Sequence, residues 1–138
     1  MTAKEYLQRA YRLDKLIESE ERELSRLRAL SERVNAPDMS RERVTGGEAG
    51  NKRENIILKM IEQEKRINDT IEQLVEVRAD IRAKIELVND DTQRLLLVYR
   101  YIDHMTWESI AEKIHYTYQW VHKLHARALR SFENILKS

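Results

Sequence analysis

Residues 106–132, TWESIAEKIHYTYQWVHKLHARALRSF, carry the most informative pattern in this sequence. Two amphipathic segments, 107–114 and 118–136, are separated by only three residues. Ala111 is a small residue at the place where two helices would cross closely. Aliphatic side chains occupy the positions that would turn inward: Ile110, Ile114, Val121 and Leu124. The pattern therefore predicts two helices that pack against each other across a tight turn.

This arrangement is typical of a helix-turn-helix, which needs a small crossing residue, apolar inward positions and a tight turn. If Trp107 is position 1 of the motif, Ala111 is position 5 and His115 is position 9, a turn position that is usually Gly and often takes a positive φ. Histidine tolerates that conformation better than a β-branched residue. Thr117 is placed to cap the second helix. A plain pair of bundle helices is the alternative, but it needs neither Ala111 nor a cap before so polar a face.

The residues upstream complete a three-helix unit over 90–138. The run Asn89-Asp90-Asp91-Thr92 consists of residues that favour helix caps, so a new helix is expected at about 92–102. The segment 103–106 is a short connector, and Thr106 is a candidate N-cap for the helix that follows.

Two long helices are predicted before this unit. Apolar residues alternate at spacings of 3 and 4 over 3–34 and again over 52–89, which is the a/d seam of a coiled coil. Glu20 and Ser31 are polar members of the first seam. Glu64 and Arg78 are polar members of the second, and they either fix the register across the interface or mark where the seam faces water.

Between these helices, residues 35–51 hold the only proline and all three glycines, so a mobile loop is expected there. Neither helix can bury its seam alone, and an antiparallel hairpin through the loop is the simplest solution. We therefore expect residues 1–89 to form a hairpin that also holds two copies together as a homodimer. The sequence leaves open whether the long helices pair within or between chains.

Composition supports an all-α fold: 36% of residues are charged, 7% are aromatic, and there is no cysteine. The chain shows neither a signal peptide nor a membrane-spanning run, so a cytoplasmic protein is expected. It contains no catalytic motif, so no enzymatic activity, cofactor or metal is expected. His122 and His125 stand three residues apart, but no third metal ligand accompanies them.

The second helix of the motif supplies the candidate DNA contacts. Its outward face near the N-terminus should enter the major groove. Gln119 can bond adenine and Lys123 can donate to guanine, so these two are the expected base readers. Arg127 and Arg130 should reach phosphates. The full set is Thr117, Tyr118, Gln119, His122, Lys123, Arg127 and Arg130.

Two further groups of rings lie near this face. Trp120 either lies on the sugar-phosphate edge or packs against Tyr116 or another chain, and packing is favoured.

All four histidines lie between His104 and His125. Their protonation near pH 6.5 should raise DNA affinity as the pH falls.

Residues 91–132, with TWESIAEKI, a turn and VHKLHARALRSF, resemble region four of bacterial sigma factors, and LLLVYRYIDHMTW resembles the helix that precedes that motif. The whole chain, from MTAKEYLQRAYRLDK onward, resembles small phage and prophage late-gene regulators of the ArpU and RinA type. The resemblance implies a phage transcription regulator. In sigma factors the positions that match Tyr118, Gln119 and Lys123 usually carry Arg, Glu and Gln, so a target other than the ordinary −35 element is expected.

The expected function is therefore sequence-specific binding of double-stranded DNA to regulate transcription, with RNA polymerase as a further candidate partner. Two alternatives remain. The first is a small-terminase-like protein that recognises phage DNA for packaging, which would form a ring of subunits. The second is an adaptor that binds RNA polymerase without touching DNA.

Overall fold

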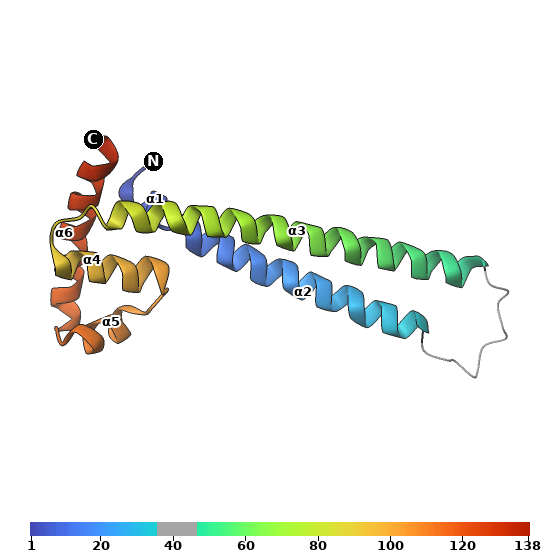
Figure 1. Cartoon of the computed structure of the whole chain (residues 1–138). Coiled ribbons are helices and arrows are strands. Elements are labelled where there is room, and N and C mark those ends of the chain that lie inside the picture. The colour runs from blue at the N-terminus through green and yellow to red at the C-terminus, as the bar shows by residue number, and fades with distance from the viewer. Residues whose placement is uncertain (36–46) are drawn as a thin grey trace. The chain divides into compact units, whose positions relative to one another are not determined.

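The protein is described here by a computed structural model that covers residues 1–35 and 47–138. Its helices are α1 (Ala3–Leu7), α2 (Arg9–Asn35), α3 (Gly47–Ile85), α4 (Asp91–Leu97), the π-helical turn η1 (Val98–Ile102), α5 (Trp107–Ile114) and α6 (Tyr118–Lys137). No strand occurs in these residues. The predicted all-α fold, a helical hairpin followed along the chain by a helix-turn-helix, is confirmed (Figure 1). Over the same ranges, no helix combines the length and the apolar character needed to cross a bilayer.

The chain forms two compact units. The hairpin unit comprises Lys15–Glu72, and the terminal unit comprises Met1–Asp14 together with Gln73–Ser138. The terminal unit is thus larger than the predicted segment 90–138, because it also includes the first residues of the chain and the end of α3.

The core of the terminal unit explains this extension. Its fully buried side chains come from both ends of the sequence: Leu7, Ile81, Ile85, Val88, Leu96, Leu97, Ile110, Val121 and Phe132. The ring of Tyr6 packs on that of Phe132, with the centroids 5.7 Å apart. Because α4, α5 and α6 share their apolar faces with α1 and α3, the helix-turn-helix has no separate core of its own.

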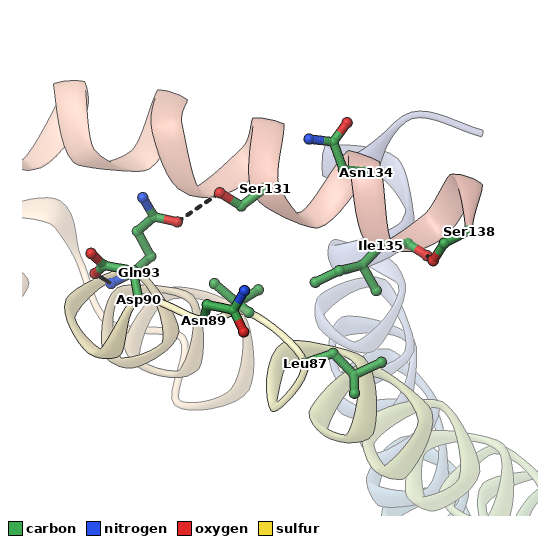
Figure 2. Close-up of a pocket in the computed structure, with 9 residues that line it drawn as sticks. Leu87, Asn89, Asp90, Gln93, Ser131, Asn134, Ile135 and Ser138 are labelled. Carbon is green, nitrogen blue, oxygen red and sulfur yellow. Dashed lines mark hydrogen bonds between the residues drawn. The ribbon is translucent and has the colours of Figure 1, made fainter.

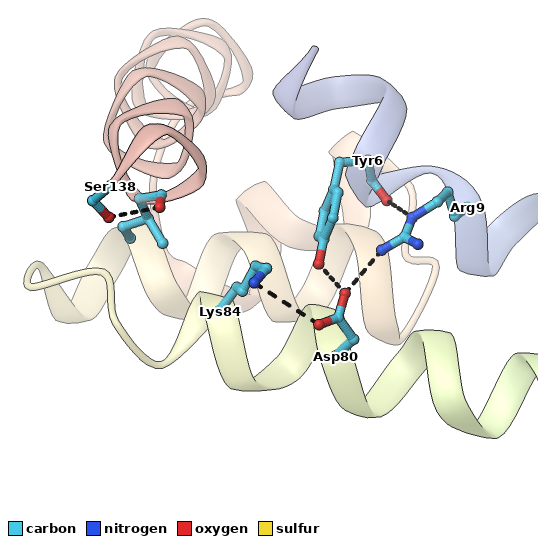
Figure 3. Close-up of polar contacts among 6 residues, drawn as sticks. Tyr6, Arg9, Asp80, Lys84 and Ser138 are labelled. Atoms are coloured by element: carbon cyan, nitrogen blue, oxygen red, sulfur yellow. Dashed lines mark hydrogen bonds and ion pairs between the residues drawn. The ribbon is translucent and has the colours of Figure 1, made fainter. Parts of the chain in front are cut away.

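A polar cluster around Asp80 joins α1 and the start of α2 to α3 (Figure 3). The Tyr6 hydroxyl donates to the Asp80 carboxylate, and Arg9 Nη2 donates to the same Oδ2 at 3.0 Å. Lys84 Nζ lies 3.9 Å from Asp80 Oδ1. These side chains are partly exposed, so the ion pairs add little stability. Their effect is to set the position of α1 on α3.

The first helical run is interrupted at Gln8, where the sequence predicts no break. The backbone of Gln8 has φ −77° and ψ −7°, and its N–H bonds to the carbonyls of Lys4 and Tyr6. Thr2 caps α1 by accepting from the N–H of Glu5, and the Glu5 carboxylate accepts from the Thr2 N–H in return. The run is therefore a short capped helix followed by the long α2.

In the hairpin unit, α2 and α3 run antiparallel. The predicted seam of α3 is confirmed at Ile67 and Leu74, which are buried, but it shifts by one residue at two other positions. Glu64 and Ile71 are exposed, and Gln63 and Thr70 are buried in their place. Gln63 Nε2 donates to the Glu20 carbonyl at 2.9 Å, and Thr70 Oγ1 donates to the Glu20 carboxylate at 3.0 Å. The Thr70 hydroxyl, which also lies 2.9 Å from the Arg66 carbonyl, offers the buried carboxylate of Glu20 a donor, which an aliphatic neighbour could not do. Glu64 instead approaches Arg28 at 3.9 Å on the surface.

The structure bears on the predicted mobile loop at 35–51 only at its two ends, because residues 36–46 lie outside the described residues. Residue Asn35 ends α2 and residues 47–51 form the first turn of α3, which corrects the prediction at both ends. A glycine costs about 1 kcal/mol relative to alanine in a helix interior. The long helix tolerates this because each added residue contributes a backbone hydrogen bond.

Candidate nucleic-acid interface

Side-chain caps and one left-handed residue shape the turn between α5 and α6. Thr106 caps α5 by accepting from the Ser109 N–H at 3.2 Å, and Thr117 caps α6 by accepting from the Trp120 N–H at 3.1 Å. His115 has φ 61° and ψ 38°. The Tyr116 N–H then bonds to the Ala111 carbonyl at 3.1 Å and closes the turn. The predicted roles of Thr106, Thr117 and His115 are confirmed.

The two helices cross where the sequence indicates. Ala111 is buried, as are the predicted inward residues Ile110, Val121 and Leu124, and only Ile114 is partly exposed. A methyl side chain at Ala111 lets the two backbones approach closely. The geometry therefore fixes α6 on α5 and leaves the opposite side of α6 uncovered.

The uncovered side of α6 begins with the predicted base readers. Gln119 and Lys123 are exposed, and Tyr118 and Trp120 have 44% and 37% of their surface accessible. At about 100° per residue, Gln119, Lys123, Ala126 and Arg130 follow one another along the ridge opposite the buried Val121 and Ala128. The start of α6 is thus free to enter a groove, which is the geometry that DNA reading requires.

Two of the four positive side chains of α6 lie near Trp120. The guanidinium carbon of Arg127 lies 5.3 Å from a ring centroid of Trp120, and Lys123 Nζ lies 6.0 Å from one. These are cation–π distances. Trp120 therefore packs with the two cations on its own helix, and its predicted contact with Tyr116 is not the one seen. Arg127 and Arg130 are both exposed.

His122 is only partly available to a ligand. It is half-buried, with its ring centroid 4.5 Å from that of Tyr118 and 4.9 Å from that of Trp107. Among the predicted DNA-contact residues, His122 packs against the most aromatic rings, namely those of Tyr118 and Trp107. The Thr117 hydroxyl is likewise engaged, since it accepts the capping bond.

His125 lies in the interior, although the sequence analysis considered it for roles at the surface, as a metal ligand or as a positive charge beside phosphate. Its Nε2 is 2.6 Å from the Tyr101 hydroxyl, and its ring contacts Trp107 at a centroid distance of 4.5 Å. Burial lowers the pKa of His125 to about 4, with smaller contributions from the positive charges of Lys4 and Arg100. Burial also raises the pKa of Tyr101 to about 12. Both side chains are neutral near pH 7, and their contact lies on the buried side of α6.

This position of His125 removes two of the uses considered from sequence. The buried ring of His125 cannot share a metal ion with the half-buried His122, and it cannot add positive charge beside phosphate. Within the described ranges, no group of three or more His, Cys, Asp or Glu side chains is placed to hold a metal. The only sequence signal for the inward orientation is the spacing of His125 from Val121 and Phe132, which places it on their face.

A cavity of about 380 Å³ lies near the C-terminal end of α6 (Figure 2). Side chains of the α3–α4 connection, of α4 and of α6 line it, and Ser131 Oγ donates to Gln93 Oε1 at 2.8 Å on its wall. Among its lining residues, Asp90 alone has a charged side chain. Without a positive group the cavity is unsuited to phosphate, so it is not part of the candidate interface.

Comparison with known proteins adds a family but no function. No curated protein and no solved structure matches the chain. A family model described as "Protein of unknown function (DUF1492)" matches residues 33–133, a range that includes α3 and most of the terminal unit. This match covers more than half of the sequence, and the chain belongs to the DUF1492 family.

Proposed function

We propose that this protein is a sequence-specific DNA-binding regulator of transcription that inserts the start of α6 into the major groove. The observation that carries the proposal is the exposed ridge of Gln119 and Lys123 at the beginning of a helix fixed by the Ala111 crossing. A helix of this kind fits the width of the major groove in B-form DNA.

The proposed contact residues divide into two roles. Gln119 and Lys123 reach base edges, where a good bidentate pair contributes about 1–3 kcal/mol of discrimination. Arg127 and Arg130 follow one and two turns later and contact phosphates, which gives affinity without sequence information. On α5 the exposed Glu108 and Glu112 would repel phosphate, so the duplex approaches from the α6 side.

The resemblance to sigma region four and to phage late-gene regulators supports a role in phage or prophage transcription. RNA polymerase is a second partner under this proposal, and two copies of the chain act together through the helical hairpin. Since the base-reading residues of sigma factors are replaced at Tyr118, Gln119 and Lys123, the target differs from the ordinary −35 element.

Selection of bound sequences from random DNA tests the proposal. The wild-type protein should enrich one motif, and Gln119→Ala and Lys123→Ala should each relax the preference at a defined base. Lys137→Ala is the matched control, because Lys137 is exposed on the same helix and pairs with Glu133 at 3.6 Å, away from the ridge start. It should leave the motif unchanged.

The salt dependence of binding separates the competing functions. If several phosphates are contacted, the logarithm of affinity should fall by about 0.9 per contact for each tenfold rise in salt. No binding to any duplex at low salt would refute the proposal and favour a polymerase adaptor. A solution mass of eight or more subunits would also count against it and favour DNA packaging.

A further inference from the structure

The exposed side of α3 carries a second apolar stripe that the hairpin does not cover. Its members alternate at spacings of 4 and 3 along one helix: Ile57, Ile61, Glu64, Asn68, Ile71 and Val75. The four aliphatic members are 43%, 56%, 39% and 60% exposed, in that order. We call this set the outer stripe. Two pairs of exposed aliphatic residues on one helix face, with Glu64 and Asn68 between them, make this stripe a candidate interaction surface.

The outer stripe exists because the hairpin buries the other face of α3. Gln63, Ile67, Thr70 and Leu74 form the buried stripe, with their polar members bonded to Glu20. At about 100° per residue, the outer stripe lies roughly a third of a turn around the helix from this buried stripe. Two polar side chains, Gln63 and Thr70, therefore lie inside the hairpin, while the four aliphatic members of the outer stripe remain exposed.

The order of residues in the outer stripe is self-complementary when two α3 helices run antiparallel. Aligned about the level of Arg66, Ile57 faces Val75 of the second copy, and Ile61 faces Ile71 of the second copy. Glu64, which lies 3.9 Å from Arg28 of its own chain, then faces Asn68 of the second copy. Each aliphatic residue then faces an aliphatic residue of the second copy, and the Glu64 carboxylate faces the Asn68 amide, which can donate to it.

A parallel pairing fits less well. In register, it would set Glu64 directly against Glu64 of the second copy and bring two like charges together at the centre of the interface. An unrelated partner with a uniformly apolar surface would leave Glu64 and Asn68, at the centre of the stripe, against apolar groups. The layer pattern favours a second copy of this chain in antiparallel orientation.

We propose that α3 binds α3 of a second copy through the outer stripe, antiparallel and centred near Arg66. This gives the dimer of the proposed regulator a specific interface, and to that extent it rests on the proposed function. Because the association can be measured without DNA, its failure is distinguishable from failure of DNA binding.

Complementary charge variants test the contact. Ile61→Glu and Ile71→Lys should each lower the solution mass from twice the 16.5 kDa chain mass to the mass of one chain. Mixed together, they should recover the dimer, because the introduced glutamate of one chain then faces the introduced lysine of the other. The symmetry-related layer keeps its pair of Ile71 and Ile61. Far-UV circular dichroism should show each variant still helical. Lys59→Glu and Gln73→Lys, on the side of α3 away from the outer stripe, are the matched control and should remain dimeric.

Cysteine cross-linking tests the direction, because the chain has no cysteine of its own. A linker with two thiol-reactive maleimide groups that spans about 8–10 Å, the separation of packed helices, should join Ile61→Cys to Ile71→Cys in a mixture. Ile61→Cys alone should not cross-link, since the two copies of residue 61 would be about 15 Å apart along the axis. Cross-linking of Ile61→Cys alone, a monomeric wild-type protein, or a mixture of charge variants that stays monomeric would each overturn the proposal.

Discussion

The buried histidine on α6 makes the stability of the terminal unit depend on pH. His125 lies between Tyr101 and Trp107, and burial lowers its pKa to about 4. In the unfolded chain the pKa of a histidine is about 6.5. As the pH falls below about 6.5, the unfolded chain takes up a proton that the folded protein cannot accept until the pH approaches 4. The stability that neutral His125 contributes is therefore fully present above pH 6.5 and is lost between pH 6.5 and 4.

The size of this loss follows from the two pKa values. At pH 5 the unfolded histidine has been protonated over about 1.5 pH units while the folded histidine remains neutral. At about 1.36 kcal/mol per unit, the free energy of unfolding should fall by up to about 2 kcal/mol between pH 7 and pH 5 through this residue. That is a large fraction of the stability of an ordinary domain.

Urea denaturation followed by far-UV circular dichroism at pH 7 and pH 5 measures the effect. His125→Gln should be less stable than the wild type at pH 7, and it should lose less stability than the wild type when the pH is lowered. His115→Asn is the matched control, since His115 is exposed and asparagine also tolerates its positive φ. It should show the full loss. If His125→Gln and the wild type lose equal stability, the reasoning about His125 is wrong.

Three further predictions follow from the packing of the terminal unit. Ala111→Leu should force α5 and α6 apart, reducing the free energy of unfolding by about 1–3 kcal/mol, whereas Glu112→Leu on the exposed face should change it little; urea denaturation compares the two. His115→Gly should raise stability by about 1 kcal/mol, because glycine adopts φ 61° without steric cost, and a lower Tm for the variant would contradict this. A fragment of residues 90–138 should unfold without a cooperative transition, because it lacks Leu7, Ile81 and Ile85 of the shared core; a calorimetric peak from the isolated fragment would show that α4, α5 and α6 suffice.

The helix-turn-helix could be predicted closely because its signals are local. Thr106 and Thr117 bond to backbone groups three residues away, and His115 adopts its left-handed conformation to close a single turn. The alternation of Ile110, Ala111, Val121 and Leu124 depends only on the 3.6-residue period of a helix. The exposure of Gln119 and Lys123 follows from the same period. For these features, neighbouring residues carry all the information needed.

Other features depend on which distant segments meet, and the tertiary structure alone decided them. The sequence by itself determined the all-α class, the two long helices, the caps and the inward positions of the motif, since each is set by interactions within a few residues. Packing decided that Tyr6 lies on Phe132, that His125 turns toward Tyr101, and that Gln63 and Thr70 replace the predicted Glu64 and Ile71 in the hairpin. The predicted and the observed stripe of α3 share Ile67 and Leu74 and differ by one residue at two positions, so they are nearly equivalent as patterns. The bond from Thr70 to the buried Glu20 favours one of them, and that bond exists only when the helices are side by side.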